Sequence, residues 1–209
     1  MEKQFIQLCR EGNLDEVKKF LRLNPDINIS ELAFRWACFN GYLEVAKWLL
    51  IVKPDINISY NNEAAFICAC ANGDLEVAKW LLSVKPDINI SYYYEQAFRN
   101  ACFEGHLEIA KWLLNVKPDI NISTFNEEAF RFTCQEGHLE LAKWLQRLKP
   151  YLYVIEYSKK GNYANYRIRT KEEENWEKRK CALHLALQEK SNLLYHLPTD
   201  IAKSVIQFV

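Results

Sequence analysis

Cysteine and histidine are among the side chains that could bind a metal, and cysteine could also act as a nucleophile. Five of the seven cysteines recur at intervals of 29 or 32 residues, most of them beside an alanine: Cys9, Cys38, Cys70, Cys102 and Cys134. Cys68 and Cys70 are the one close pair, but residues two apart on a helix point in different directions, which does not suit zinc. We therefore expect buried thiols in a reducing compartment and no metal site.

No set of residues for catalysis can be assembled from the sequence. His106 and His138 occupy the same position in two copies of a predicted turn, where we expect a structural hydrogen bond. The sequence has no glycine-rich phosphate loop, no serine, histidine and aspartate set, and no paired acids outside charge-balanced helices. We therefore expect a protein that is not an enzyme and that needs no cofactor.

The repeated cysteines belong to a longer repeat, which organises residues 1–150. Its marker glycines lie 32 residues apart, with the first copy 29 residues before the second: Gly12, Gly41, Gly73, Gly105 and Gly137. A period this strict is typical of a solenoid in which similar units stack on one another. We expect units at about 1–30, 31–58, 59–90, 91–122 and 123–150.

The third unit shows the fold expected of one repeat. Residues 64–72 have apolar side chains at i, i+3 and i+4, which predicts a short helix with one apolar face. Gly73 follows, where a chain that leaves a helix needs a positive φ. Residues 74–82 are the second predicted helix, and Pro86 ends it. Each unit is therefore predicted to be helix, tight turn, helix and extended connector.

The segment before the first helix of each unit is predicted to be a finger-like loop. Ser59, Asn61 or Asn62 could accept hydrogen bonds from the first backbone amides of the helix. In the second unit this loop is three residues shorter, because Glu31 follows Ser30 directly. One finger is therefore expected to be trimmed.

A single helix pair cannot cover its own apolar faces, so the copies must stack to bury them. Each of units two to five has one tryptophan on the flank of its second helix, and we expect these to pack between neighbouring units: Trp48, Trp80, Trp112 and Trp144.

Variation among the copies indicates where a partner would bind. On a helical wheel of the first helix, the positions of Ala64, Cys68 and Ala71 point outward, flanked by that of Ile67, and there and in the fingers the copies differ most. Exposed Tyr, Trp, Phe and Arg anchor protein interfaces because they bury much area for little lost entropy. The predicted partner-binding residues are Trp36, Phe39, Tyr60, Asn61, Tyr92, Tyr93, Tyr94, Arg99, Asn100, Phe103, Phe125, Arg131, Phe132 and Gln135. The alternative is that these aromatics only pack between units, which fits Phe132 and Trp36 better than the tyrosines.

After Pro150 the pattern changes. Residues 151–157 and 163–169 are rich in β-forming side chains and are separated by a turn-like segment, so they predict a β-hairpin insertion near 151–169. Residues 171–209 are predicted to form capping helices of a degenerate sixth unit, the last of them over 199–209.

The charge balance excludes several classes of partner. Lysine plus arginine and aspartate plus glutamate each total 27, so there is no net charge to attract nucleic acid or an anionic membrane. No segment approaches the roughly 18 apolar residues that a bilayer crossing requires. We therefore expect a cytoplasmic monomer with neither nucleic acid nor a membrane as partner.

The repeat resembles the ankyrin repeat. Residues 105–114 read Gly-His-Leu-Glu-Ile-Ala-Lys-Trp-Leu-Leu, which is similar to the family's Gly-His-Leu-Glu-Val-Val-Lys-Leu-Leu-Leu. Residues 119–121 resemble its Ala-Asp-Val-Asn, and residues 97–102 stand in for Pro-Leu-His-x-Ala-Ala. The resemblance implies an all-α solenoid of about five units plus a cap, and a non-catalytic scaffold that binds a protein partner through its concave face and fingers. The family's Thr-Pro helix start is missing here, and the finger turn is one residue shorter, so the finger geometry departs from the family's.

Two narrower resemblances bear on function. The Lys-Pro-Asp-Ile-Asn-Ile-Ser connector and the tryptophan of the second helix are similar to ankyrin proteins of giant DNA viruses of amoebae, the mimivirus group, which implies a host partner in the host cytoplasm. Near the C-terminus, residues 197–209 resemble the start of an F-box through Leu197, Pro198, Ile201, Val205 and Ile206. That resemblance implies an alternative function, a substrate adaptor that docks the Skp1 subunit of a cullin ubiquitin ligase. The segment is shorter than an F-box, and a plain cap helix is the other interpretation.

Overall fold

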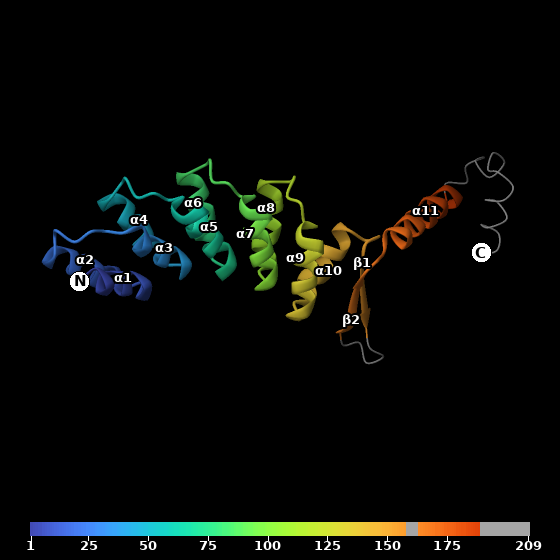
Figure 1. The fold of residues 1–209 in the computed structure, drawn as a ribbon, viewed down its shortest axis with the longest axis horizontal. Helices are drawn as coiled ribbons and strands as arrows, with labels where there is room; N and C mark the ends of the chain where they lie inside the picture. Colours follow the sequence, from blue (N-terminus) through green and yellow to red (C-terminus); the bar gives the residue numbers. More distant parts are fainter. Residues whose placement is uncertain (158–162, 189–209) are drawn as a thin grey trace. The chain divides into compact units, whose positions relative to one another are not determined.

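The computed structural model describes residues 1–157 and 163–188 (Figure 1). The chain divides into two compact units, Met1–Ala142 and Lys143–Val209. The helices of the repeats are α1 (Glu2–Glu11), α2 (Leu14–Leu23), α3 (Glu31–Phe39), α4 (Leu43–Val52), α5 (Tyr60–Asn72), α6 (Leu75–Val84), α7 (Tyr92–Phe103), α8 (Leu107–Val116), α9 (Thr124–Gln135) and α10 (Leu139–Leu148). They are followed by β1 (Tyr153–Tyr157), β2 (Tyr163–Ile168) and α11 (Lys171–Gln188).

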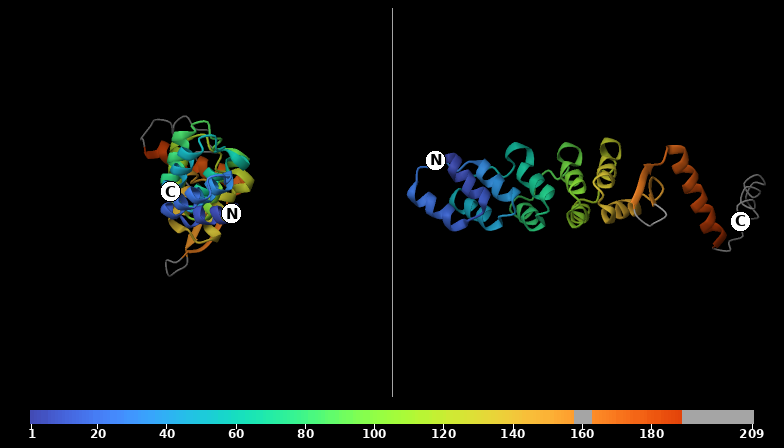
Figure 2. Two further views of the ribbon diagram at one scale, coloured as in Figure 1. Left: turned by 90° about the vertical axis from the view of Figure 1, so that its left-hand side faces the viewer. Right: turned by 90° about the horizontal axis from the view of Figure 1, so that it is seen from below.

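The first compact unit is a serial stack of helix pairs. Helix α1 packs on α3, α3 on α5, α5 on α7 and α7 on α9, while α2, α4, α6 and α8 each pack on the first helix of their own pair. Figures 1 and 2 show these pairs side by side in one row. The predicted all-α solenoid of ankyrin type is therefore confirmed.

The core of the stack repeats one set of buried side chains per unit. Each first helix buries a phenylalanine at the same position, 0 or 1% exposed in every copy: Phe5, Phe34, Phe66, Phe98 and Phe130. The ring of Trp80 lies 6.2 Å from that of Phe34, and the ring of Trp112 lies 6.2 Å from that of Phe66. These two tryptophans therefore pack across unit boundaries, as predicted.

The turn between the two helices of a pair also contacts the next unit. Gly73 has a φ of 88°, and a Cβ at this position would lie 2.7 Å from His106 of the next turn, so only glycine fits. His138 Nε2 donates to the carbonyl oxygen of Phe103 at 2.9 Å. Asn72 Nδ2 likewise donates to the carbonyl oxygen of Phe39, in the preceding unit, at 2.7 Å. The structural hydrogen bond predicted for His138 is therefore present.

The fingers adopt a backbone that the sequence did not predict. Asn61, Asn62 and Glu63 have φ of 55°, 63° and 61°, which is a left-handed turn of three consecutive residues. The same turn recurs at residues 93–95 and 125–127. The predicted N-cap is wrong, because Ser59 makes no side-chain cap hydrogen bond and its hydroxyl donates instead to the carboxylate of Glu63 at 2.7 Å.

The second compact unit contains the predicted β-hairpin. Strands β1 and β2 pair antiparallel, with Tyr153 opposite Ile168 and Ile155 opposite Tyr166. The expected turn, residues 158–162, and the predicted cap helix over 199–209 lie outside the described residues. Nowhere in the described ranges does a helix combine the length and the apolar composition that a bilayer crossing requires.

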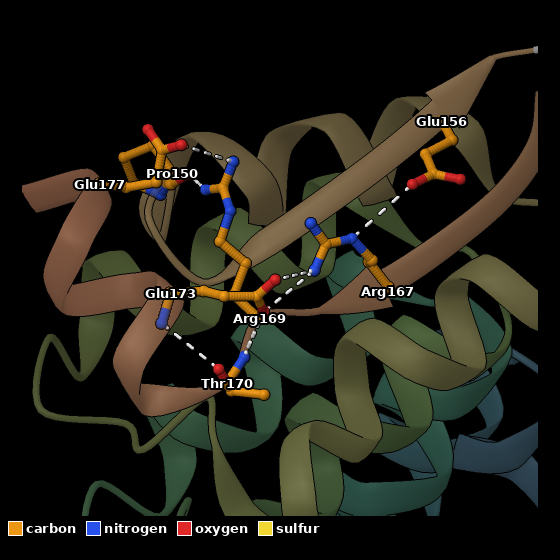
Figure 3. Close-up of polar contacts among 7 residues, drawn as sticks. All are labelled: Pro150, Glu156, Arg167, Arg169, Thr170, Glu173 and Glu177. Carbon is orange, nitrogen blue, oxygen red and sulfur yellow. Dashed lines mark hydrogen bonds and ion pairs between the residues drawn. The ribbon is translucent and has the colours of Figure 1, made fainter. Parts of the chain in front are cut away.

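A network of polar contacts ties the hairpin to α11 (Figure 3). Thr170 N–H donates to Glu173 Oε2 at 2.9 Å and Glu173 N–H donates to Thr170 Oγ1 at 3.3 Å, which is a capping box at the start of the helix. Arg167 of β2 reaches both carboxylate oxygens of Glu173, at 2.9 and 3.0 Å. Arg169 donates to the carbonyl oxygen of Pro150 at 3.1 Å and lies 3.9 Å from Glu177. The start of α11 is thereby fixed by the strand that precedes it.

Candidate functional site

An exposed cluster of aromatic rings joins two neighbouring fingers. Tyr93 and Tyr94 of finger 4 (residues 91–95) are 58% and 64% exposed, and Phe125 of finger 5 (residues 123–127) is 48% exposed. The ring centroids of Tyr93 and Tyr94 are 5.7 Å apart, and Phe125 lies 6.2 Å from Tyr93 and 5.1 Å from Tyr94. We call these three residues the aromatic cluster. The three rings contact one another, and each residue remains about half or more exposed to solvent.

Arg99 of α7 contacts all three residues of the aromatic cluster. Its Nε donates to the carbonyl oxygen of Tyr94 at 2.9 Å, and Nη2 donates to that of Tyr93 at 3.1 Å. Its Nη1 pairs with the carboxylate of Glu128 in the next unit. Its guanidinium carbon lies 4.5 Å from the ring centre of Phe125, a cation–π arrangement. With 11% of its side chain exposed, Arg99 joins the two fingers.

A buried glutamate helps to fix the left-handed turn in fingers 3 and 4. Glu63 and Glu95 are 9% and 8% exposed although they are charged residues. The Oε1 of Glu63 accepts the backbone N–H of Asn89 at 3.3 Å, and Oε1 of Glu95 accepts that of Asn121 at 3.4 Å. Each of these bonds crosses from a finger to the following connector. Fingers 3 and 4 are therefore each bonded to the connector that follows them.

The other predicted partner-binding residues form smaller groups. Phe103 and Phe132 make an edge-to-face pair 5.4 Å apart at the far ends of α7 and α9. Trp36 and Phe39 make another, 5.3 Å apart, and Arg10 lies 4.6 Å over the Trp36 ring. Tyr92 is half-buried and its ring lies 6.3 Å from that of Tyr93, at the edge of the aromatic cluster. The remaining ones are exposed or half-buried and belong to neither pair: Tyr60, Asn61, Asn100, Arg131 and Gln135.

Three residues of this surface were missed in the sequence. Arg10 occupies the position of Phe39 and Phe103 in the first unit, so aligning the copies could have found it. Glu95 and Glu128 carry no such signal, because acidic residues near a helix start are usually solvated. The F-box-like residues, from Leu197 to Ile206, lie outside the described residues.

The buried cysteines of the stack are poorly suited to act as nucleophiles or metal ligands. Burial raises the pKa of Cys9 to about 12, and it raises the pKa of Cys70 and Cys102 further still. A thiol with so high a pKa is protonated near neutral pH and is a poor nucleophile or metal ligand. In residues 1–157 and 163–188, His, Cys, Asp and Glu side chains form no group of three that could hold a metal ion.

Comparison with known families agrees with the architecture. Residues 5–92 match the family described as ankyrin repeats (3 copies), and residues 98–146 match the family described as ankyrin repeats (many copies). No curated protein matches the chain. The two family matches cover most of the stack of helix pairs, so the chain belongs to the ankyrin-repeat proteins.

Proposed function

We propose that this chain is a non-catalytic scaffold that binds a protein partner through the aromatic cluster and the adjoining face of the first helices. Ankyrin repeats are generally scaffolds for protein–protein interaction. The observation that carries the proposal is the exposure of three large aromatic rings at 48–64%, although the phenylalanine repeated in every first helix is buried almost completely. A few residues supply most of the binding energy of a protein interface, and tyrosine is one of the types enriched among them.

The fixed backbone of the fingers supports the same function. Glu95 and Arg99 hold the backbone of Tyr93 and Tyr94 in place, and the guanidinium of Arg99 lies against Phe125. A surface that is already ordered loses little conformational entropy on binding, which favours affinity. From the resemblance to ankyrin proteins of giant viruses, we expect the partner to be a host protein.

The test replaces the cluster with residues that the chain already uses in a finger. Finger 3 has Asn61 and Asn62 where finger 4 has Tyr93 and Tyr94. The triple variant Tyr93→Asn, Tyr94→Asn, Phe125→Asn removes the rings but keeps side chains that tolerate a left-handed backbone. The partner is first captured with the unchanged chain, purified, and titrated against both proteins. We expect affinity to fall by at least about 30-fold, the loss typical of hot-spot residues.

The matched control changes three exposed apolar residues on the second helices to asparagine: Ile51, Val84 and Val116. This control should bind the captured partner as well as the unchanged chain does. A folded aromatic-cluster variant that keeps full affinity would refute the proposed site.

A further inference from the structure

A second surface of the stack is hollowed between the first two units. A groove with a volume of about 440 Å³ is lined by Lys18, Leu21 and Arg22 of α2, by Pro25 after that helix, and by Trp48 of α4. These helices contact one another and are drawn at the N-terminal end of the stack in Figure 1. The groove lies on the second helices, apart from the fingers that carry the aromatic cluster. Leu21, Pro25 and Trp48 give the groove an apolar surface, and the cationic side chains of Lys18 and Arg22 also line it.

The charge of this groove distinguishes the first unit from units two to four, although the fifth unit has Arg147 at the position of Arg22. The residue at the position of Arg22 is Ile51, Ser83 or Asn115 in the next three units. The lysine at the position of Lys18 also recurs, but in those units it pairs at 2.8–2.9 Å with a glutamate three residues earlier: Lys47 with Glu44, Lys79 with Glu76 and Lys111 with Glu108.

The first unit has Asp15 at the position of those glutamates, and its carboxylate is one methylene shorter. Within the described part of the chain, neither Lys18 nor Arg22 has an ion pair with a carboxylate, whereas Lys19 lies 3.8 Å from Glu16. The two cations beside the groove are therefore available to a ligand, whereas in units two to four the arginine is absent and the lysine is paired.

We propose that this groove is a second binding site, which takes an acidic peptide segment that places an aliphatic or aromatic side chain next to carboxylates. The apolar side chain would lie on Leu21, Pro25 and Trp48, and the carboxylates would meet Lys18 and Arg22. Two cations on a chain of zero net charge suit one or two carboxylates, whereas a nucleic acid backbone requires a longer row of cations. The site does not depend on the aromatic cluster, so the two sites can be tested separately.

The experiment uses defined peptides and the full-length protein. The probe is the fluorescent peptide Asp-Leu-Glu-Phe-Asp, with Lys-Leu-Lys-Phe-Lys and Asp-Ser-Glu-Ser-Asp as comparison peptides of opposite charge or without apolar side chains. Binding is measured by fluorescence anisotropy and by the NMR signal of the Trp48 indole N–H. We expect the first peptide to bind more tightly than both others and to shift the Trp48 signal. In the Lys18→Glu, Arg22→Glu variant, its affinity should fall at least about tenfold through lost attraction and new repulsion.

Lys19→Glu is the control, because it reverses one charge, as each of the two groove substitutions does, on the same helix but outside the groove. It should bind the acidic peptide with nearly unchanged affinity. The proposal is overturned if the acidic peptide does not bind, if it binds no better than the comparison peptides, or if the groove variant binds as the control does. Circular dichroism of each variant shows that the helices are intact.

Discussion

Arg99 shows how one side chain can join two repeats. Its guanidinium donates to two carbonyl oxygens of its own finger and pairs with Glu128 of the next unit, while its flat face covers Phe125. A planar group with five N–H donors suits this task, whereas the single ammonium of lysine does not. Arg99 is therefore best described as a positioning residue for the aromatic cluster.

Replacing Arg99 by alanine should loosen the two fingers. The change leaves Glu128 and the carbonyl oxygens of Tyr93 and Tyr94 without their donor, so we expect a loss of about 1–3 kcal/mol in the free energy of unfolding. Urea unfolding measures this loss. Arg99→Lys should restore little of it, because lysine cannot reach the same acceptors in fork geometry.

Arg131 is the matched control, since it occupies the same position in the next unit. Within the described part of the chain it makes no such set of bonds, and Arg131→Ala should change the free energy of unfolding by no more than about 0.5 kcal/mol. Equal losses for the two variants would contradict the role assigned to Arg99.

The two arginines also show what sequence reasoning could reach at this scale. Both were predicted to bind a partner, because a repeat period shows which positions are equivalent and which vary. The period does not show that Phe125 and Glu128 lie within reach of Arg99, since that depends on a neighbour 26 to 29 residues away. The roles of single variable residues are therefore set by packing between units.

At the scale of the element, the fingers combine a costly backbone with side chains that compensate for it. Three successive left-handed residues that are not glycine cost roughly 1–2 kcal/mol each, and finger 4 has two tyrosines among them. The sequence Ser-Tyr-Asn-Asn-Glu indicated a turn and an N-cap, and the turn is there. Its handedness could not be predicted, because a hydrogen bond from Asn89, 26 residues later at the end of the same unit, to Glu63 helps to fix it.

Deleting Tyr92, Tyr93 and Tyr94 should trim finger 4 without unfolding the stack. The deletion joins Ser91 to Glu95, which is the arrangement that the second unit already has at Ser30 and Glu31. Strain is removed and the ring contacts are lost, so we expect a free energy of unfolding between the original value and about 2 kcal/mol above it. Thermal unfolding by circular dichroism measures the change. A stability clearly below that of the unchanged chain would mean that the finger supports the fold.

The capping box of α11 predicts a dependence on pH. Bonds from Thr170 and from Arg167 hold the pKa of Glu173 below its ordinary value of 4.5. The stability that this carboxylate adds is therefore complete above that value and is lost as the pH falls through the lower pKa of the folded state. Glu173→Gln should weaken the start of α11 at neutral pH and flatten this dependence, as measured by amide hydrogen exchange of residues 171–176. Glu172→Gln makes the same change of charge at an exposed neighbour, and an equal effect there would exclude the capping box as the cause.

At the scale of the whole molecule, the stack within Met1–Ala142 is held together by contacts between neighbours. Each first helix packs on those of the units before and after it, and the same phenylalanine is buried in every copy. The sequence predicted this architecture because the period itself specifies stacking. The structure beyond the stack is less repetitive, and there the sequence predicted a hairpin and a helix from local patterns alone.

A serial stack predicts that the effect of a core mutation depends on its position. Phe66 lies in the middle unit, with neighbours on both sides, whereas Phe5 lies in the first unit, yet both rings are essentially inaccessible to solvent. Either change to alanine removes a buried ring, at a local cost of about 3–5 kcal/mol. Phe5→Ala should raise amide exchange in α1 and α2 and leave α5 to α8 protected, because the remaining units still cover one another. Phe66→Ala should raise exchange in α3 to α8, since it weakens both interfaces of the central unit. Exchange that rises uniformly along the stack in both variants would show that the units unfold together, so that a partner held by the fingers of units four and five would depend on the integrity of the first unit as well.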